Sequence, residues 1–574
     1  MIIGLLLFIS MLLWCLFFKN SGFDPGTVAG SGNGKLLNVL FFVTFAVSLS
    51  ALAFNDQIYE RPLVYYACII ILYLIIFFDI LYSSPANMIL LKIMLIAISY
   101  SWSELLTFPG LIGIDPWYHQ TFTNDIIGTG HISSEYSYTY LPAFHLMISC
   151  TSFVTGFDYK ISSMISVSLL QIVCNTLFVY IVTYLMFNNR KLSLIAALML
   201  AISNYNIFMS YWIIPNGFAA IFILFTVYLT MKYSQANKMI YLLIIVLVLI
   251  VTILSHTLVT GFLLLVLAVT YIFSLIYNVN RRNMAIIFVI LVLYLISFIL
   301  YWTYVSGSIG ILLDIARIII SVNPLDHAIG SGRVIQSSYE LIIANSGMYL
   351  FFTLSLIGVL YMISRKGSHM TRSFAIIGLI PLTISFFSIF LKEDSLTDRW
   401  WFISELLLSV PLSVTVYMIF QYLDSRVNRY AMVTVLFLVS LALVGFMIFS
   451  PQASIDNDAF TPNSTIRFSL TQSEINSMNY AINVSKIPIM TDDYYASTAK
   501  YQRYVFTFDN LSEQNVNDLE NNYLLVRDDI FDRPSFESSH LRFFDEGVKR
   551  AFGNHSKVYS SGSVHGYISN GDGA

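Results

Sequence analysis

Charged residues are scarce in this chain: Asp, Glu, Lys and Arg make up 11% of its 574 residues, whereas hydrophobic residues make up 57%. Soluble domains carry roughly a quarter charged residues, so this composition excludes a protein built mainly around an aqueous-phase core and indicates one embedded in a membrane. The net charge of −3 gives no basis for a nucleic-acid partner.

Cysteine is also rare. Cys15, Cys68 and Cys174 lie within apolar stretches, Cys150 borders one, and the polar C-terminal region has none, which excludes a disulfide framework there. A Gly-rich phosphate loop, a Cys/His metal cluster and a GxSxG motif are absent as well. The first 18 residues lack the positive start and small-residue cleavage site of a signal peptide, so we expect a retained span.

Long apolar runs are the main feature of the sequence. A transmembrane helix needs about 20 mostly apolar residues. Fourteen stretches qualify, at 2–18, 36–54, 63–83, 88–108, 161–187, 192–210, 217–232, 239–255, 258–278, 284–304, 341–364, 374–391, 402–420 and 430–450. We therefore predict a mainly α, polytopic helical membrane bundle of about fourteen spans.

The distribution of Lys and Arg predicts the orientation of this bundle, because positive side chains resist translocation. With the N-terminus outside, the alternate connections that become cytoplasmic hold thirteen Lys and Arg residues, and the opposite connections hold six. We expect a multi-pass protein of the cell membrane whose N-terminus and C-terminal segment are extracytoplasmic.

This topology places three polar segments outside: 109–160, 305–340 and everything after 450. In the last segment, Thr471 and Glu474 predict a capping box that opens a helix. Runs at 487–491, 504–508 and 523–526 predict strands, and 558–568 predicts a hairpin. We expect three parts, with boundaries at 1–87, 88–450 and 451–574, of which the last is a small α/β domain.

The strongest candidate for a chemical site opens the first polar segment. An acidic residue there follows an outward-running span and has aromatic and His neighbours, in the run Gly113-Ile114-Asp115-Pro116-Trp117-Tyr118-His119. A carboxylate in this place can deprotonate a hydroxyl or hold a divalent cation against a phosphate. Alternatively, Asp-Pro only starts a turn and an interfacial helix at Pro116.

This run, at the start of an external loop, resembles the GT-C superfamily of membrane glycosyltransferases, especially the catalytic subunit of oligosaccharyltransferases and related archaeal enzymes. The resemblance implies transfer of a sugar from a polyprenyl-phosphate or diphosphate carrier to a glycan, lipid or protein acceptor. Asp115 would serve the acceptor or hold a divalent cation such as Mg²⁺ or Mn²⁺. Residues 88–450 would be the catalytic membrane region, with 1–87 as additional helices. The Trp-Trp-Asp-Tyr-Gly signature of oligosaccharyltransferases is absent from the C-terminal region.

The resemblance makes other ionisable residues at outer helix ends candidates for the active site, because such groups are costly in a membrane and are commonly functional there. We predict Asp115 and His119 as catalytic, and Arg399 and Arg333 as ligands of the donor phosphate. Further polar groups expected in the cavity are Glu104, His145, His256, Asp398 and Glu405. Alternatively, Arg399 pairs with Asp398 or Glu405, and Glu104 and His256 make interhelical hydrogen bonds.

Three other functions compete with sugar transfer. A transporter or lipid flippase also has many spans, but it more naturally shows related halves or paired broken helices at the midplane. A polysaccharide polymerase or ligase is the enzymatic alternative. An adhesion or structural membrane protein predicts that the charges at the outer helix ends can be replaced freely.

Overall fold

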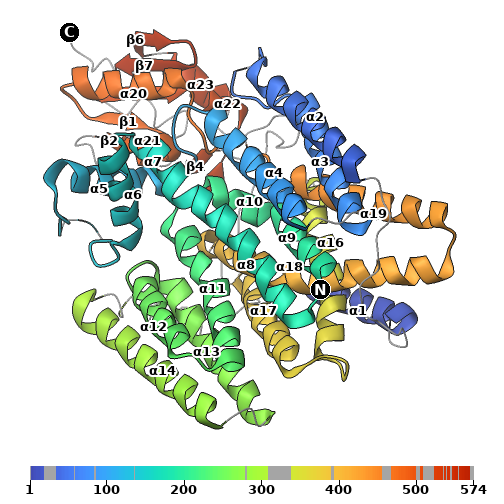
Figure 1. Cartoon of the computed structure of the whole chain (residues 1–574). Helices are drawn as coiled ribbons and strands as arrows, with labels where there is room; N and C mark the ends of the chain where they lie inside the picture. Colours follow the sequence, from blue (N-terminus) through green and yellow to red (C-terminus); the bar gives the residue numbers. More distant parts are fainter. Residues whose placement is uncertain are drawn as a thin grey trace.

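The computed structural model describes residues 2–18, 34–56, 58–82, 86–134, 136, 138–277, 281–307, 310, 338–388, 394–455, 467–499, 505–508, 522–533, 535–537, 540–542, 546–553 and 555–568. These residues form a helical bundle with a small sheet region near the C-terminus, at one end of the bundle (Figure 1). The predicted fold class is therefore confirmed.

Most of the apolar runs are membrane-length helices. Within the described ranges, eleven helical segments are long and apolar enough to cross a membrane. They are built from α2 (Gly34–Ala53), α3 (Leu63–Tyr82), α4 (Ala86–Thr107), α7 (Tyr159–Ser163) with η2 (Met164–Ser168) and α8 (Leu169–Phe187), α11 (Pro215–Ala236), α13 (Thr257–Ile276), α14 (Arg281–Leu300) with η3 (Tyr301–Val305), α16 (Ser338–Ile363), α17 (His369–Ser388), α18 (Asp394–Arg426) and α19 (Arg429–Ile448). The chain is thus a multi-pass membrane protein.

The predicted count of about fourteen spans is not confirmed. Two of the predicted spans are shorter apolar helices, α1 (Ile2–Leu13) with η1 (Trp14–Phe18), and α12 (Met239–Ile253). The predicted span 192–210 is a pair of helices bent by 60°, α9 (Arg190–Ile202) and α10 (Asn204–Tyr211). Counting this pair as one span gives up to twelve in the part of the chain that is described.

Glu405 explains how the chain tolerates the break between α9 and α10. Ser203 adopts an extended conformation there, so the first N–H groups of α10 lose their helical partners. One carboxylate oxygen of Glu405 accepts hydrogen bonds from the N–H groups of Tyr205 and Asn206, at 2.9 and 3.3 Å. A buried acceptor on α18 therefore completes the N-terminus of α10.

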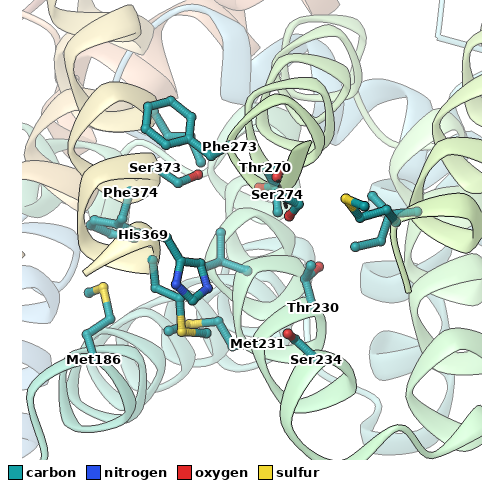
Figure 2. Close-up of a pocket in the computed structure, with 15 residues that line it drawn as sticks. Met186, Thr230, Met231, Ser234, Thr270, Phe273, Ser274, His369, Ser373 and Phe374 are labelled. Atoms are coloured by element: carbon teal, nitrogen blue, oxygen red, sulfur yellow. Dashed lines mark hydrogen bonds between the residues drawn. The ribbon is translucent and has the colours of Figure 1, made fainter. Parts of the chain in front are cut away.

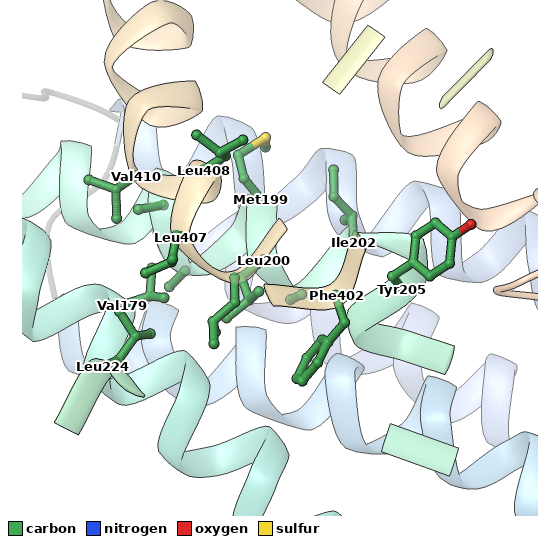
Figure 3. Close-up of a cluster of buried hydrophobic side chains, with 14 of the residues drawn as sticks. Val179, Met199, Leu200, Ile202, Tyr205, Leu224, Phe402, Leu407, Leu408 and Val410 are labelled. Carbon is green, nitrogen blue, oxygen red and sulfur yellow. The ribbon is translucent and has the colours of Figure 1, made fainter. Parts of the chain in front are cut away.

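Helix α18 is the centre of the bundle, because 94% of its most apolar 18-residue stretch is buried. Side chains of α8, α9 and α11 pack around it, as Figure 3 shows for Val179, Leu200, Leu224, Phe402 and Leu407.

Glycines let α16 approach its neighbours closely, as small residues do between membrane helices. A Cβ atom on Gly358 would overlap the carbonyl group of Pro411 in α18. One on Gly347 would lie 2.7 Å from the backbone of Phe446 in α19. Both crossings are therefore backbone to backbone.

Two ion pairs lie inside the described part of the bundle. Arg61 and Glu104 lie 2.5 Å apart, and Lys92 and Asp79 lie 2.6 Å apart. All four side chains are at most 3% exposed. An unpaired charge would be far more costly in such surroundings, so each pair links its two elements in one relative position.

The C-terminal region has one five-stranded sheet with the strand order β2-β1-β3-β7-β6. Strand β1 (Ile489–Thr491) is parallel to β2 (Val505–Thr507) and β3 (Tyr523–Arg527), whereas β7 (Val564–Ile568) is antiparallel to β3 and β6 (Ser556–Ser561). Strands β4 (Ser535–Glu537) and β5 (His540–Arg542) form a second pair. The helices are α20 (Gln472–Val484), α21 (Asp493–Ala499), α22 (Asp529–Asp532) and α23 (Glu546–Phe552).

The sequence predictions for this region hold closely. The Thr471–Glu474 capping box is present at the start of α20. The three predicted strands correspond to β1, β2 and β3, and the predicted hairpin is β6–β7.

Two helices of the first polar segment, α5 (Asp115–Thr129) and α6 (Ala143–Thr155), lie beside the C-terminal region (Figure 1). Trp117 of α5 packs against both the bundle core and the core of the C-terminal region. The N–H group of Gly113 donates to the carbonyl oxygen of Phe468 at 2.7 Å. The start of α5 is therefore held between the two parts.

Replacing Gly358 with Val tests the close crossing of α16 and α18. The new side chain would collide with the Pro411 carbonyl group, and overpacking of this kind costs about 1–3 kcal/mol or more. We expect a clearly lower midpoint of thermal unfolding for the purified protein, followed by tryptophan fluorescence. The matched control is Gly445→Val on α19, where a Cβ atom meets open space. Equal midpoints for the two variants would contradict the crossing.

Candidate functional site

Asp115 lies at the N-terminus of α5, as the Asp-Pro sequence predicted. Pro116 occupies the first turn, where its missing N–H group costs nothing, and the positive end of the helix dipole favours the Asp115 carboxylate. Gly113, two residues before, has φ +85°, a left-handed conformation that suits glycine, and a Cβ atom there would overlap the Trp212 ring. Gly113 therefore allows the tight turn that presents Asp115.

Arg399 of α18 is the partner of Asp115. Its Nη2 atom donates to Oδ2 of Asp115 at 3.0 Å. The Arg399 side chain is 16% exposed and that of Asp115 37% exposed, so the pair is open on the carboxylate side. The Nε atom of Arg399 is buried and has no hydrogen-bond partner in the described part of the protein. The pair thus keeps donor and acceptor capacity for a ligand.

Three histidines belong to the same region as this ion pair. Nδ1 of His119 and Nε2 of His145 lie 3.0 Å apart, and both side chains are buried. His256 immediately precedes α13, and its environment and that of His119 both include the positive charge of Arg399. The structure therefore brings Asp115, His119, His145, His256 and Arg399 into one cluster.

The histidine pair is uncharged near neutral pH. Burial is the main cause that lowers the pKa of His119 well below its ordinary value, and His145, Arg399 and His256 add to it. Burial lowers the pKa of His145 to about 3. Since both rings are neutral, one of the two facing nitrogens donates the shared hydrogen bond and the other accepts it.

The other predicted residues lie elsewhere or have other partners. Glu104 forms the buried ion pair with Arg61, and Glu405 accepts from the N-terminus of α10. Asp398 accepts a hydrogen bond from the hydroxyl group of Tyr205. Arg333, and nearly all of the 305–340 loop, lie outside the described residues.

Sequence reasoning missed the partners that give these residues their roles. It did not pair Asp115 with Arg399, 284 positions away, nor Glu104 with Arg61, because charge spacing along a chain reveals only neighbours within one helix. It noted Tyr138 only as part of an aromatic run, yet its ring stands edge-on to His119 with the centroids 4.8 Å apart. The aromatic enrichment of this segment was the only signal for that contact.

In the cluster described above, Asp115 is the carboxylate that could coordinate a divalent cation. Among the described residues, no group of three or more His, Cys, Asp or Glu side chains is arranged to hold a metal ion. Mg²⁺ is often held by only one or two carboxylates together with substrate phosphates. The described residues do not build a dedicated cation site, so any metal here would depend on ligands from a substrate.

Known structures share this arrangement of helices, whereas no protein-family model and no curated protein matches the sequence. The archaeal oligosaccharyltransferase AglB from Archaeoglobus fulgidus, in complex with an inhibitory peptide and a dolichol-phosphate, matches with a TM-score of 0.50 and 13% identity over 84% of this chain and 74% of its own. The Archaeoglobus fulgidus oligosaccharyltransferase in complex with Zn and sulfate matches with a TM-score of 0.50 and 11% identity over 83% and 73%.

A structure of ArnT from Cupriavidus metallidurans bound to undecaprenyl phosphate also matches, with 9% identity over 85% of this chain and 98% of its own. Its TM-score is 0.48. The two oligosaccharyltransferase structures support the fold by themselves. The chain shares the fold of these two structures, which agrees with the fold that the predicted resemblance implies.

The two buried histidines predict a pH-dependent stability. The unfolded chain protonates His119 and His145 below about pH 6.5, whereas the folded chain does so only at a much lower pH. The free energy of unfolding should therefore fall as pH drops below about 6.5, by up to about 1.4 kcal/mol per pH unit for each histidine. Thermal unfolding of the detergent-solubilised protein between pH 5 and 7.5 measures this slope.

The variant for this test is His145→Gln, which keeps a hydrogen-bonding side chain next to His119 and removes one titrating group. We expect a shallower decline of the unfolding midpoint with falling pH. His131→Gln, at an exposed position on the same polar segment, should leave the slope unchanged. A slope for His145→Gln equal to that of the wild type would contradict the prediction.

Proposed function

We propose that this protein is a membrane glycosyltransferase that transfers a sugar from a polyprenyl-phosphate or diphosphate carrier to an acceptor on the extracytoplasmic side. The observation that carries the proposal is the Asp115–Arg399 ion pair, which joins the loop helix α5 to the central helix α18 and is open to a ligand. The GT-C-type fold and the lipid phosphate named with the AglB structure support it.

Asp115 acts as the base in this proposal. The hydroxyl oxygen of the acceptor forms a bond to the anomeric carbon of the sugar, and the bond between that carbon and the phosphate oxygen breaks. The hydroxyl proton passes to the Asp115 carboxylate, and the electron pair of the broken bond leaves with the phosphate. One displacement step of this kind inverts the configuration at the anomeric carbon.

Arg399 neutralises the leaving phosphate. Before the reaction its guanidinium group faces the Asp115 carboxylate, and once that carboxylate takes up the proton, the negative charge lies on the departing phosphate instead. Arg399 is thus near one anionic partner at every stage, and its buried Nε offers a further donor. Stabilising charge that develops at the leaving group is commonly the largest single catalytic contribution.

The remaining groups of the cluster play supporting roles. His119 and His145, both neutral, hold the start of α5 against α6 and keep a polar, uncharged wall beside the ion pair. His256 contributes a further polar contact from the start of α13. A divalent cation, Mg²⁺ or Mn²⁺, would bind Asp115 together with the carrier phosphate and add positive charge there.

The site and the C-terminal region are extracytoplasmic in this proposal, and so is the N-terminus. The excess of Lys and Arg in the opposite connections supports this orientation. Gly113, just before α5, is hydrogen-bonded to Phe468, and Trp117 of α5 packs against the same core as Ile475, so the cluster and the C-terminal region share one side.

Replacing Asp115 with Asn tests the proposal. Purified protein in nanodiscs receives native lipid extract as donor, and both sugar transfer and release of polyprenyl phosphate are measured. Loss of the base should lower turnover about 100-fold or more, and Arg399→Ala should lower it to a similar degree. Retention of the wild-type unfolding midpoint shows that the variants are folded.

Matched controls come from the same two helices. Asp125→Asn changes the other carboxylate of α5, and Arg426→Ala changes the Arg at the far end of α18; both should keep near-wild-type turnover. Normal turnover in Asp115→Asn would reject this site while keeping the transferase. Movement of the lipid across the bilayer without sugar transfer would favour a flippase instead.

A further inference from the structure

We infer that the end of the bundle opposite the Asp115–Arg399 cluster has a binding crevice for an anionic two-chain phospholipid of the surrounding bilayer. The crevice opens between the C-terminal halves of α11 and α13 and the N-terminal parts of α14 and α17 (Figure 2). This inference does not depend on sugar transfer, because it concerns other residues and another ligand.

The position of the crevice suits a lipid. Helices α8, α11 and α13 end near it, and α14 and α17 begin near it, so it lies where the membrane-length helices meet the polar connections. A phospholipid whose chains enter such a crevice keeps its phosphate at the boundary with water. The chemistry of the crevice therefore has to match both ends of that molecule.

The wall of the crevice matches an acyl chain. Its surface is mostly apolar and rich in flexible methionine, with side chains from Met186, Met231, Met284, Phe273, Phe374 and Ile287. The hydroxyl groups of Thr230, Thr270 and Ser274 also face it, but each donates its hydrogen to a carbonyl oxygen of its own helix. These groups therefore demand no polar partner from the ligand.

The mouth of the crevice matches a phosphate. His369 lines it, and the centroid of the Tyr277 ring lies 6.2 Å from that of His369 and 5.4 Å from the guanidinium group of Arg372. Nη1 of Arg372 also donates to the Tyr277 hydroxyl group. Nε and Nη2 of Arg372 donate to the carbonyl oxygen of Ser364 at 3.2 and 2.8 Å, which holds the side chain in place. Among the described residues, no carboxylate pairs with Arg372.

The charge around this mouth has one sign. The connections 188–191, 232–238, 277–283 and 364–372 contain nine Lys and Arg residues and no Asp or Glu. An arginine that is held in place without a counter-ion is a favourable site for a phosphate group. The charge of the connections complements an anionic headgroup over a zwitterionic one.

Native mass spectrometry of the purified full chain tests this inference. The protein is mixed with equal amounts of phosphatidylglycerol and phosphatidylcholine of the same chain length, and retained lipid is counted. We expect preferential retention of phosphatidylglycerol. Ser274→Phe, which fills the crevice, and Arg372→Gln, which removes the charge, should each lower this retention at least fivefold.

Arg426→Gln is the matched control, because Arg426 also lies at a helix end in a basic connection but away from the crevice. It should retain phosphatidylglycerol as the wild type does. Equal retention of both lipids by the wild type, or equal losses in Arg372→Gln and Arg426→Gln, would overturn the inference. In a second arm with polyprenyl phosphate, displacement of phosphatidylglycerol at equimolar amounts would assign the crevice to the carrier lipid and overturn it as well.

Discussion

A charged or polar group without a partner is costly inside an apolar bundle, and the architecture of this protein depends on how that cost is reduced. Arg61 with Glu104 and Lys92 with Asp79 are neutralised in place, and each pair links two elements in one relative position. Glu405 meets the same demand for backbone groups, since its carboxylate accepts from the freed N–H groups of α10. The bent pair α9–α10 and the central helix α18 are thereby fixed to each other.

The Asp115–Arg399 pair differs from the two buried pairs in its exposure. Its carboxylate is more than a third exposed, and one guanidinium nitrogen is buried without a described partner. The buried pairs are closed to a ligand, whereas a pair with an exposed carboxylate can exchange partners at modest cost. This difference, and not the presence of charge, distinguishes the candidate site from the structural ion pairs below it.

The geometry of the site depends on contacts between parts far apart in the chain. Trp117 packs on both hydrophobic cores, and the Gly113 N–H group bonds to Phe468, so the helix that carries Asp115 is held by the bundle on one side and by the C-terminal region on the other. Arg399 comes from α18, the most buried of the membrane-length helices described. An arginine of the central helix thus faces a carboxylate on a separately anchored loop helix.

The sequence alone determined the features that local patterns specify. Apolar runs predicted the membrane helices, Asp115-Pro116 predicted the start of α5, and Thr471 with Glu474 predicted the capping box of α20, because each depends on residues within a few positions of one another. Only the tertiary structure decided which charges meet. It paired Arg399 with Asp115, paired Glu104 with Arg61, and turned Glu405 from an expected cavity group into the acceptor for α10. It also shortened α1 and α12 and bent the 192–210 span, since the length of an apolar run sets an upper limit on a helix but not where neighbouring helices break it.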